Sequence, residues 1–157
     1  MRPAASSCVR TVSIVIVALA LGFGSAYVEA ESQPAGYIKI ATGSNVLVRS
    51  GAERQARPGD AVYENDVLRT GVDGRLGVTL KDDTRISLGP GSEIALSEFT
   101  FAPEEGRLGF VMKMLRGVAE LITGRIAALR PDSVRIETPV AVIGVRGTHL
   151  AIRAEGP

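Results

Sequence analysis

Short segments in which every second residue is apolar, each ending near glycine or proline, fill the chain from residue 36 onward. The alternating residues are Leu76, Val78 and Leu80, Ile86 and Leu88, Ile94 and Leu96, and Val134 and Ile136, continued by Thr138. Because successive side chains of a strand point to opposite faces, this spacing places each set on one side of a sheet. The pattern predicts an all-β fold of many short strands and hairpins that form a compact sandwich or roll, with solenoid-like stacking as an alternative.

Polar turns separate the predicted strands. Residues 42–45 (TGSN), 71–74 (GVDG) and 88–92 (LGPGS) contain the glycine, asparagine and proline that turns favour. Residues 81–84 (KDDT) join two alternating segments, which predicts a hairpin with a solvated tip. The polar segment 49–59 is expected to be exposed.

One segment, 109–130, fits two kinds of structure. Its apolar residues recur at roughly helical spacing, namely Phe110, Met114, Leu115, Val118, Ala119 and Ile122. Gly117 and Gly124 count against a continuous helix, since each glycine costs about 1 kcal/mol there. Two strands at 110–115 and 118–123, joined as a hairpin at Arg116 and Gly117, are the favoured interpretation.

The first thirty residues differ from the rest of the chain. Arg2 and Arg10 flank the start of an uncharged apolar run at 12–23, and small residues follow up to Ala30. This order is typical of a secretory signal peptide, here an N-terminal signal helix cleaved after Ala30. The alternative is an uncleaved anchor, because the 18 residues 11–28 reach the lower limit of a membrane span.

Cleavage would leave residues 31–157 without a thiol, because Cys8 is the only cysteine. Such a domain has no disulfide, no cysteine nucleophile and no thiolate metal site. Residues 31–157 contain 16 basic and 16 acidic side chains and no block of like charge. This neutral balance and the absence of tryptophan predict that the domain does not bind nucleic acid.

The sequence GVRGT near the C-terminus is the candidate binding site. Arg146 lies between Gly144 and Gly147 and is followed by Thr148, so it could contact an anion or a partner protein. The favoured interpretation is structural: a tight turn in which Arg146 donates to carbonyl or carboxylate groups inside the fold, since a guanidinium carries five donors. The apolar residues 140–143 before this turn are predicted to form a fully buried strand.

Other polar residues predict no catalytic or metal site. His149 is the only histidine, and one histidine without cysteine is poor evidence for a metal centre; it is expected to be a strand residue after a turn. Residues 82–84 lack the repeated oxygen ligands of a calcium loop. Asp60, Glu64 and Asp66 are spread acids around a turn, and the chain has no nucleophile elbow, phosphate loop or dinucleotide fingerprint. The sequence therefore predicts no enzyme activity, no cofactor and no metal.

Four segments, in this order, match the pattern of a known family. They are GYI with VLVR at 36–49, PGD with NDVLRTG at 58–71, GVTL, DDT and ISLGPGS at 77–92, and TPVAVIGVRGT at 138–148. Together they resemble the FecR domain over about residues 36–152. One departure is Asp83, where the family has glycine, but aspartate tolerates the left-handed conformation of such a turn better than most residues.

The resemblance implies an exported, non-catalytic domain that binds an unidentified protein or cell-envelope ligand in extracytoplasmic sensing or regulation. FecR-type transducers also carry a cytoplasmic sigma-regulating segment before their membrane span, and residues 1–11 leave no room for one here. The alternative is a structural component of the envelope or a glycan-binding accessory protein. Contact with a membrane is expected only if the signal segment stays uncleaved.

The predicted organisation has four parts. A signal peptide or uncleaved anchor occupies 1–30, a short polar lead 31–35, the FecR-type β domain 36–153 and a tail 154–157. After cleavage we expect the protein in the periplasm or secreted from the cell.

Overall fold

A computed structural model describes residues 33–146 and 149–156 of the chain. The predicted signal peptide at 1–30, Gly147 and Thr148 lie outside these residues, so the expectations placed on them stay predictions. In the described part, strands dominate and the helices are short, which confirms the all-β prediction. No described helix is long and apolar enough to cross a membrane.

Twelve strands and three short helical segments make up the described part of the chain. The strands are β1 (Gly36–Thr42), β2 (Asn45–Arg49), β3 (Ala52–Gln55), β4 (Ala61–Val62), β5 (Val67–Thr70), β6 (Arg75–Leu80), β7 (Arg85–Leu88), β8 (Glu93–Ala102), β9 (Arg107–Ile122), β10 (Val134–Glu137), β11 (Val142–Gly144) and β12 (His149–Ala154). The helical segments are η1 (Pro103–Glu105), α1 (Arg125–Leu129) and η2 (Pro131–Ser133).

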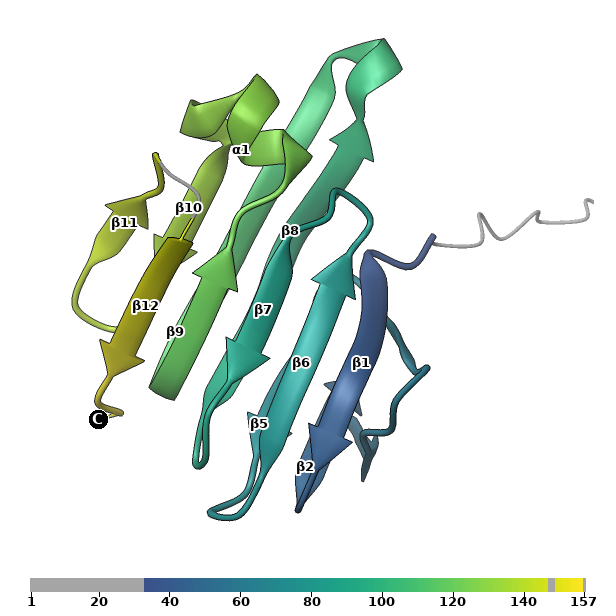
Figure 1. Cartoon of the computed structure of the whole chain (residues 1–157), viewed down its shortest axis with the longest axis vertical. Coiled ribbons are helices and arrows are strands. Elements are labelled where there is room, and N and C mark those ends of the chain that lie inside the picture. Colours follow the sequence, from purple (N-terminus) through teal and green to yellow (C-terminus); the bar gives the residue numbers. More distant parts are fainter. Residues whose placement is uncertain (1–32, 147–148, 157) are drawn as a thin grey trace, which may run out of the picture. The chain divides into compact units, whose positions relative to one another are not determined.

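The strands form one sheet that curls into two layers, which share the long strand β9. The order is β4-β1-β6-β7-β9-β12 in the front layer and β3-β2-β5-β8-β9-β10-β11 in the back layer. Figure 1 shows β1, β6, β7, β9 and β12 side by side in the front layer. All strand pairs are antiparallel except β9 with β10. The connection between these two strands contains α1 and returns the chain to the end of the sheet where β9 begins, so β10 runs parallel to β9. This architecture agrees with the predicted sandwich.

The predicted hairpin at Arg116 and Gly117 is wrong, although the preference for strands over a helix is confirmed. β9 continues through both residues. Its first half pairs with β8 in the back layer and its second half with β7 in the front layer. Gly117 has a φ of 91°, which bends the strand instead of reversing it. Ser92 fixes the bend, because its hydroxyl accepts from the Val118 N–H and donates to the Val118 carbonyl, both at 2.9 Å.

Apolar side chains from both layers form the core. The apolar residues that the period-two spacing assigned to inner faces are all buried, which confirms that prediction, whereas Thr138 lies beyond the end of β10 and is half-buried. Phe110, Met112 and Met114 in the first half of β9, Leu121 in its second half and Ile126 of α1 are also fully buried. Burying one such side chain contributes about 1.5–3 kcal/mol, so the core can hold the two layers together without a disulfide.

The hairpin at 81–84 joins β6 to β7 as predicted, and Asp83 has the expected left-handed φ of 69°. The prediction of a solvated tip is wrong for Asp82 and Thr84, which are buried. The Asp82 carboxylate accepts from the Thr84 hydroxyl at 2.7 Å and from the N–H of Ile126, in the first turn of α1, at 3.3 Å. The tip is buried because α1, which follows β9 in the chain, folds against it.

The predicted buried strand at 140–143 is also wrong. β11 begins only at Val142, and the side chains of Val140 and Val142 are 93% and 68% exposed. A turn precedes the strand, in which both the N–H and the hydroxyl of Thr138 donate to the Ala141 carbonyl. β11 is an edge strand that pairs with β10 alone, so its apolar residues are not enclosed between two neighbours.

Candidate functional site

Arg146 lies on the surface just after β11, which ends at Gly144. Its guanidinium donates to Oδ1 of Asp132 at 2.9 Å, and the two side chains are 80% and 81% exposed. The predicted carboxylate partner exists, but the pair lies at the surface and not inside the fold. The role of the turn stays a prediction, because Gly147 and Thr148 lie outside the described residues. The buried residue of this segment is Val145.

Arg146→Ala should lower the free energy of unfolding by less than about 1 kcal/mol, because exposed ion pairs contribute about 0–1 kcal/mol. A thermal melt followed by circular dichroism should therefore show a midpoint within about 4 °C of the wild type. Asp132→Ala removes the other member of the same pair and should have an equally small effect. A loss of 2 kcal/mol or more in either variant would contradict the exposed placement.

His149 begins β12, which confirms the prediction that it is a strand residue. The predicted turn before it falls on residues 147 and 148, outside the described part of the chain. Its Nε2 bonds to Oε1 of Glu120 on the neighbouring strand β9, and both side chains are exposed. Within residues 33–146 and 149–156, no group of three or more histidine or acidic side chains could hold a metal ion. The histidine thus takes part in an exposed pair on the sheet surface.

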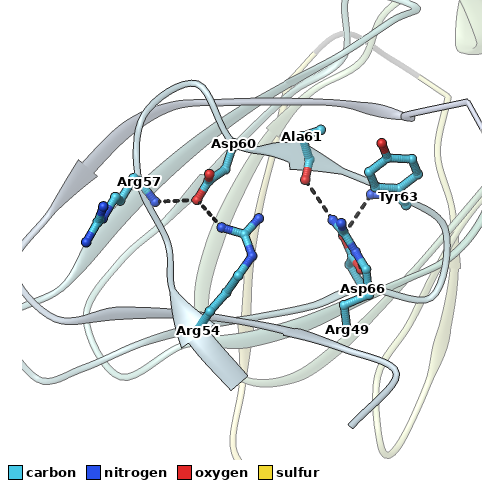
Figure 2. A network of polar contacts seen from close by, with 7 residues as sticks. All are labelled: Arg49, Arg54, Arg57, Asp60, Ala61, Tyr63 and Asp66. Carbon is cyan, nitrogen blue, oxygen red and sulfur yellow. Dashed lines mark hydrogen bonds and ion pairs between the residues drawn. The ribbon is translucent and has the colours of Figure 1, made fainter. Parts of the chain in front are cut away.

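Two of the acids noted in the sequence bind arginines, and the first of these contacts is a buried clamp (Figure 2). The fully buried Asp66 accepts from Nε and Nη2 of Arg49 at 2.8 and 2.7 Å and from the Tyr63 N–H at 2.8 Å. The same guanidinium donates to the Ala61 carbonyl at 2.8 Å and lies 4.2 Å from the centre of the Tyr63 ring. The bond to Asp66 raises the pKa of Arg49. This clamp joins the end of β2 to the 61–66 segment.

The second contact in Figure 2 involves Asp60, which accepts from the Arg54 guanidinium at 2.7 Å and from the Arg57 N–H at 2.8 Å. Burial would raise the pKa of Asp60, but these two donors together lower it below its ordinary value. Glu64 accepts from the Phe99 N–H at 3.2 Å. Each of the three acids therefore bonds a different partner within the fold, and these contacts give no support to a pair of catalytic carboxylates.

The strongest candidate for a binding site is a groove of about 710 Å³ beside the bend of β9. Its walls come from β9, the start of β8, the segment after β10 and the C-terminal tail. The residues that line it are Glu93, Lys113, Met114, Leu115, Arg116, Glu137, Thr138, Pro139 and Gly156. We name this feature the β9 groove.

Charged pairs border the β9 groove, while much of its surface is apolar. Lys113 lies 3.6 Å from Glu137, and Arg116 lies 3.1 Å from Glu93, each measured from nitrogen to oxygen. The opposite charges offset one another, and the side chain of Leu115 between them is 37% exposed. An apolar patch with a polar rim is typical of surfaces that bind a ligand or protein. Sequence reasoning missed this groove, since its walls come from distant segments.

Comparison with known families now adds to the geometry. A family model described as FecR protein matches residues 66–157, which is more than half of the chain. The chain belongs to the FecR family. No curated protein and no solved structure matches it. All residues that line the β9 groove lie within the matched part of this FecR protein.

Membership of the FecR family gives the protein a sensing or regulatory role, because the family is regulatory rather than enzymatic and is associated with the cell envelope. Strands β1 to β4 precede the matched segment. They nevertheless pair with strands inside or at the start of it, β1 with β6 and β2 with β5. The described residues before Asp66 are therefore part of the same sheet as the matched segment.

Proposed function

We propose that this FecR domain is exported and acts outside the cytoplasm as a non-catalytic module that binds a protein or another component of the cell envelope. The β9 groove carries the proposal. It lies within the family segment, its charges are internally compensated, and Pro139 on its wall is followed by the exposed Val140. The signal-peptide pattern at 1–30 and the association of the family with the envelope support the location.

The two edges of the back layer favour binding on the side of β11. At the other edge, β3 is exposed at every residue, as the polar segment 49–59 was predicted to be, and its Glu53 and Arg54 form ion pairs with Arg69 and Asp60. Charged side chains of this kind protect an edge strand from added strands. β11 consists of valine, isoleucine and glycine and has no such protection. A partner can therefore add a strand at this edge.

A second hollow bears on the alternative of a glycan-binding accessory protein, because sugars stack on exposed aromatic rings. This hollow, of about 810 Å³, is lined in part by Tyr63, Phe99 and Phe101. Each ring already has a partner within the fold. Guanidinium groups lie over Tyr63 and Phe101 at 4.2 and 4.9 Å, and Phe99 makes an edge contact with Phe110. Since these contacts compete with stacking by a sugar, protein or peptide binding is the stronger proposal.

Photo-crosslinking in cells tests the proposed function. A photoreactive amino acid replaces Val140, beside the β9 groove, in the full chain. The matched control replaces Val72, which is 92% exposed in the turn between β5 and β6. We expect a discrete crosslinked adduct in the envelope fraction from position 140 and none from position 72. The intact mass of the protein should correspond to a chain that begins at Glu31.

Three results would count against the proposal. Equal crosslinking from both positions would mean that the adducts arise from random collision. The absence of any adduct from position 140 across growth conditions would mean that the groove does not bind a partner. Binding of the protein to purified cell-wall material that soluble glycan displaces would favour the accessory-protein alternative.

A further inference from the structure

The register of the front layer arranges its outward side chains in rows across the strands. Opposite one another in the middle row lie Ile40, Gly77, Ser87, Glu120 and Ala151, one from each of β1, β6, β7, β9 and β12. The row on one side contains Arg75 and Arg153, and the row on the other side contains Arg85 and His149. Rows that contain large basic side chains thus lie on both sides of a middle row whose side chains are mostly small.

These cations are not neutralised within the described chain. Lys39, Arg75, Arg85 and Arg153 are exposed, and none of them forms an ion pair with residues 33–146 or 149–156. The described strands of this face carry one outward acid, Glu120, which is bonded to His149. Three further exposed acids lie at the strand ends: Asp73 and Asp83 in turns, and Glu155 directly after β12.

The outer surface of the back layer shows the opposite arrangement. There Arg69 of β5 lies 3.2 Å from Glu93 on the neighbouring strand β8 and 2.8 Å from Glu53 on β3, two strands away. Arg116 of β9 lies 3.1 Å from Glu93, so both arginines are paired with acids. Opposite charges on neighbouring strands stabilise a sheet. In the described part of the front face, the Glu120–His149 contact is the one acid–base pair between neighbouring strands, even though residues 31–157 as a whole contain equal numbers of basic and acidic side chains. The positive charge of the front face therefore complements an acidic partner.

The shape of the face favours a linear partner. Gly77 and Ser87 form part of a shallow trough of about 450 Å³ that Arg75, Ile40 and Val118 also line. Five strands at about 4.8 Å spacing give the middle row a length of roughly 19 Å, which an extended peptide of about six residues would span. Ile40 and Val118 are 57% and 41% exposed and offer apolar contacts at the two ends of the trough.

We infer that the front face binds an extended acidic segment of a partner protein along this trough. Three of the four unpaired cations are arginines, and arginine binds a carboxylate through two parallel hydrogen bonds. The trough contains no aromatic side chain on which a sugar could stack, and its concave centre suits a linear chain better than a flat bilayer. The inference rests on the proposed function, namely that the domain acts by binding.

Fluorescence anisotropy with the full chain tests the inference. The probe is a labelled peptide of roughly ten residues in which glutamate alternates with serine, and its counterpart has glutamine for glutamate. We expect the glutamate peptide to bind at least about tenfold more tightly, with an affinity that falls as salt rises. Arg75→Gln/Arg85→Gln/Arg153→Gln should lose at least that factor while keeping the wild-type melting midpoint.

Two further variants make the result specific. Arg130→Gln/Arg135→Gln removes exposed arginines that also lack an ion pair in the described chain, and it should leave binding within about twofold of the wild type. Ser87→Tyr fills the trough without changing charge and should weaken binding about as much as the triple variant.

Several outcomes would overturn the inference. The first two are equal affinity for both peptides and an equal loss of affinity in the triple and control variants. The other two are binding of anionic vesicles, in place of the peptide, through the same arginines, and self-association of the chain that the triple variant abolishes. The Val140 crosslink separates this failure from failure of the proposed function. If the triple variant still forms that adduct while the peptide does not bind, only the front-face inference fails.

Discussion

Gly117→Ala should destabilise the domain by roughly 2–5 kcal/mol and lower its melting midpoint by about 6 °C or more. Two effects add at this position. The φ of 91° is a left-handed conformation that costs an L-residue about 1–2 kcal/mol. A Cβ there would also overlap Cα and Oγ of Ser92, and relieving such overpacking typically costs about 1–3 kcal/mol. Moving Ser92 would break both of its bonds to Val118, which hold the bend of β9.

Gly106→Ala is the matched control for this prediction. Gly106 has a φ of 66°, but a Cβ there would have nothing within 4 Å, so only the conformational cost of about 1–2 kcal/mol remains. Circular dichroism melts of the two variants therefore separate strain from packing. Equal midpoints for the two would mean that β9 absorbs the methyl group, and the role given to Ser92 in fixing the bend would be wrong.

The bend at Gly117 also shows which parts of this fold a sequence can reveal. Period-two burial is a local property of a strand, so the inward positions of Leu76 and Val78 were predictable before any partner strand was known. A glycine between two apolar runs fits a reversal of the chain as well as a bend. Ser92, in the turn just before β8, decides between them, and its contact with Val118 depends on the tertiary fold.

Edge and core strands raise the same difficulty. The apolar residues at 140–143 have the composition of a buried strand, but burial depends on how many neighbours a strand acquires, and β11 acquires one. Arg146 was recognisable as a candidate because its flanking glycines are adjacent in the chain. The exposure of Arg146 was not predictable, because no local sequence pattern shows whether its partner Asp132 lies at the surface or in the core.

The two proposed binding surfaces were beyond sequence analysis for a geometric reason. The β9 groove joins Glu93 to Pro139 and Gly156, and the middle row of the front face joins Gly77 to Ser87 and Ala151. Neither set forms a motif along the chain. Both arise from strand register, which is set by the hydrophobic pattern of every strand together. Composition supported only broad predictions, such as the expectation that the domain does not bind nucleic acid.

Asp82→Ala should lower the free energy of unfolding by roughly 3 kcal/mol, because it removes a buried charged acceptor that several donors share. The carboxylate accepts from the Thr84 hydroxyl at 2.7 Å, the Thr84 N–H at 3.1 Å and the Ile126 N–H at 3.3 Å. Alanine leaves the two N–H groups without this acceptor in a region that water does not reach. The Arg125 N–H still donates to the Asp82 backbone carbonyl, so α1 should loosen without leaving the hairpin entirely.

Asp83→Asn is the matched control for Asp82→Ala, since it changes an adjacent acid that is exposed and tolerates the same left-handed φ of 69°. We expect it to change stability by less than about 0.5 kcal/mol. Amide hydrogen exchange supplies a second readout, because Asp82→Ala should accelerate exchange at Ile126 before the strands of the front layer lose protection. Equal melting midpoints for the two variants, with unchanged exchange at Ile126, would show that the Asp82 carboxylate does not hold α1 against the β6–β7 hairpin.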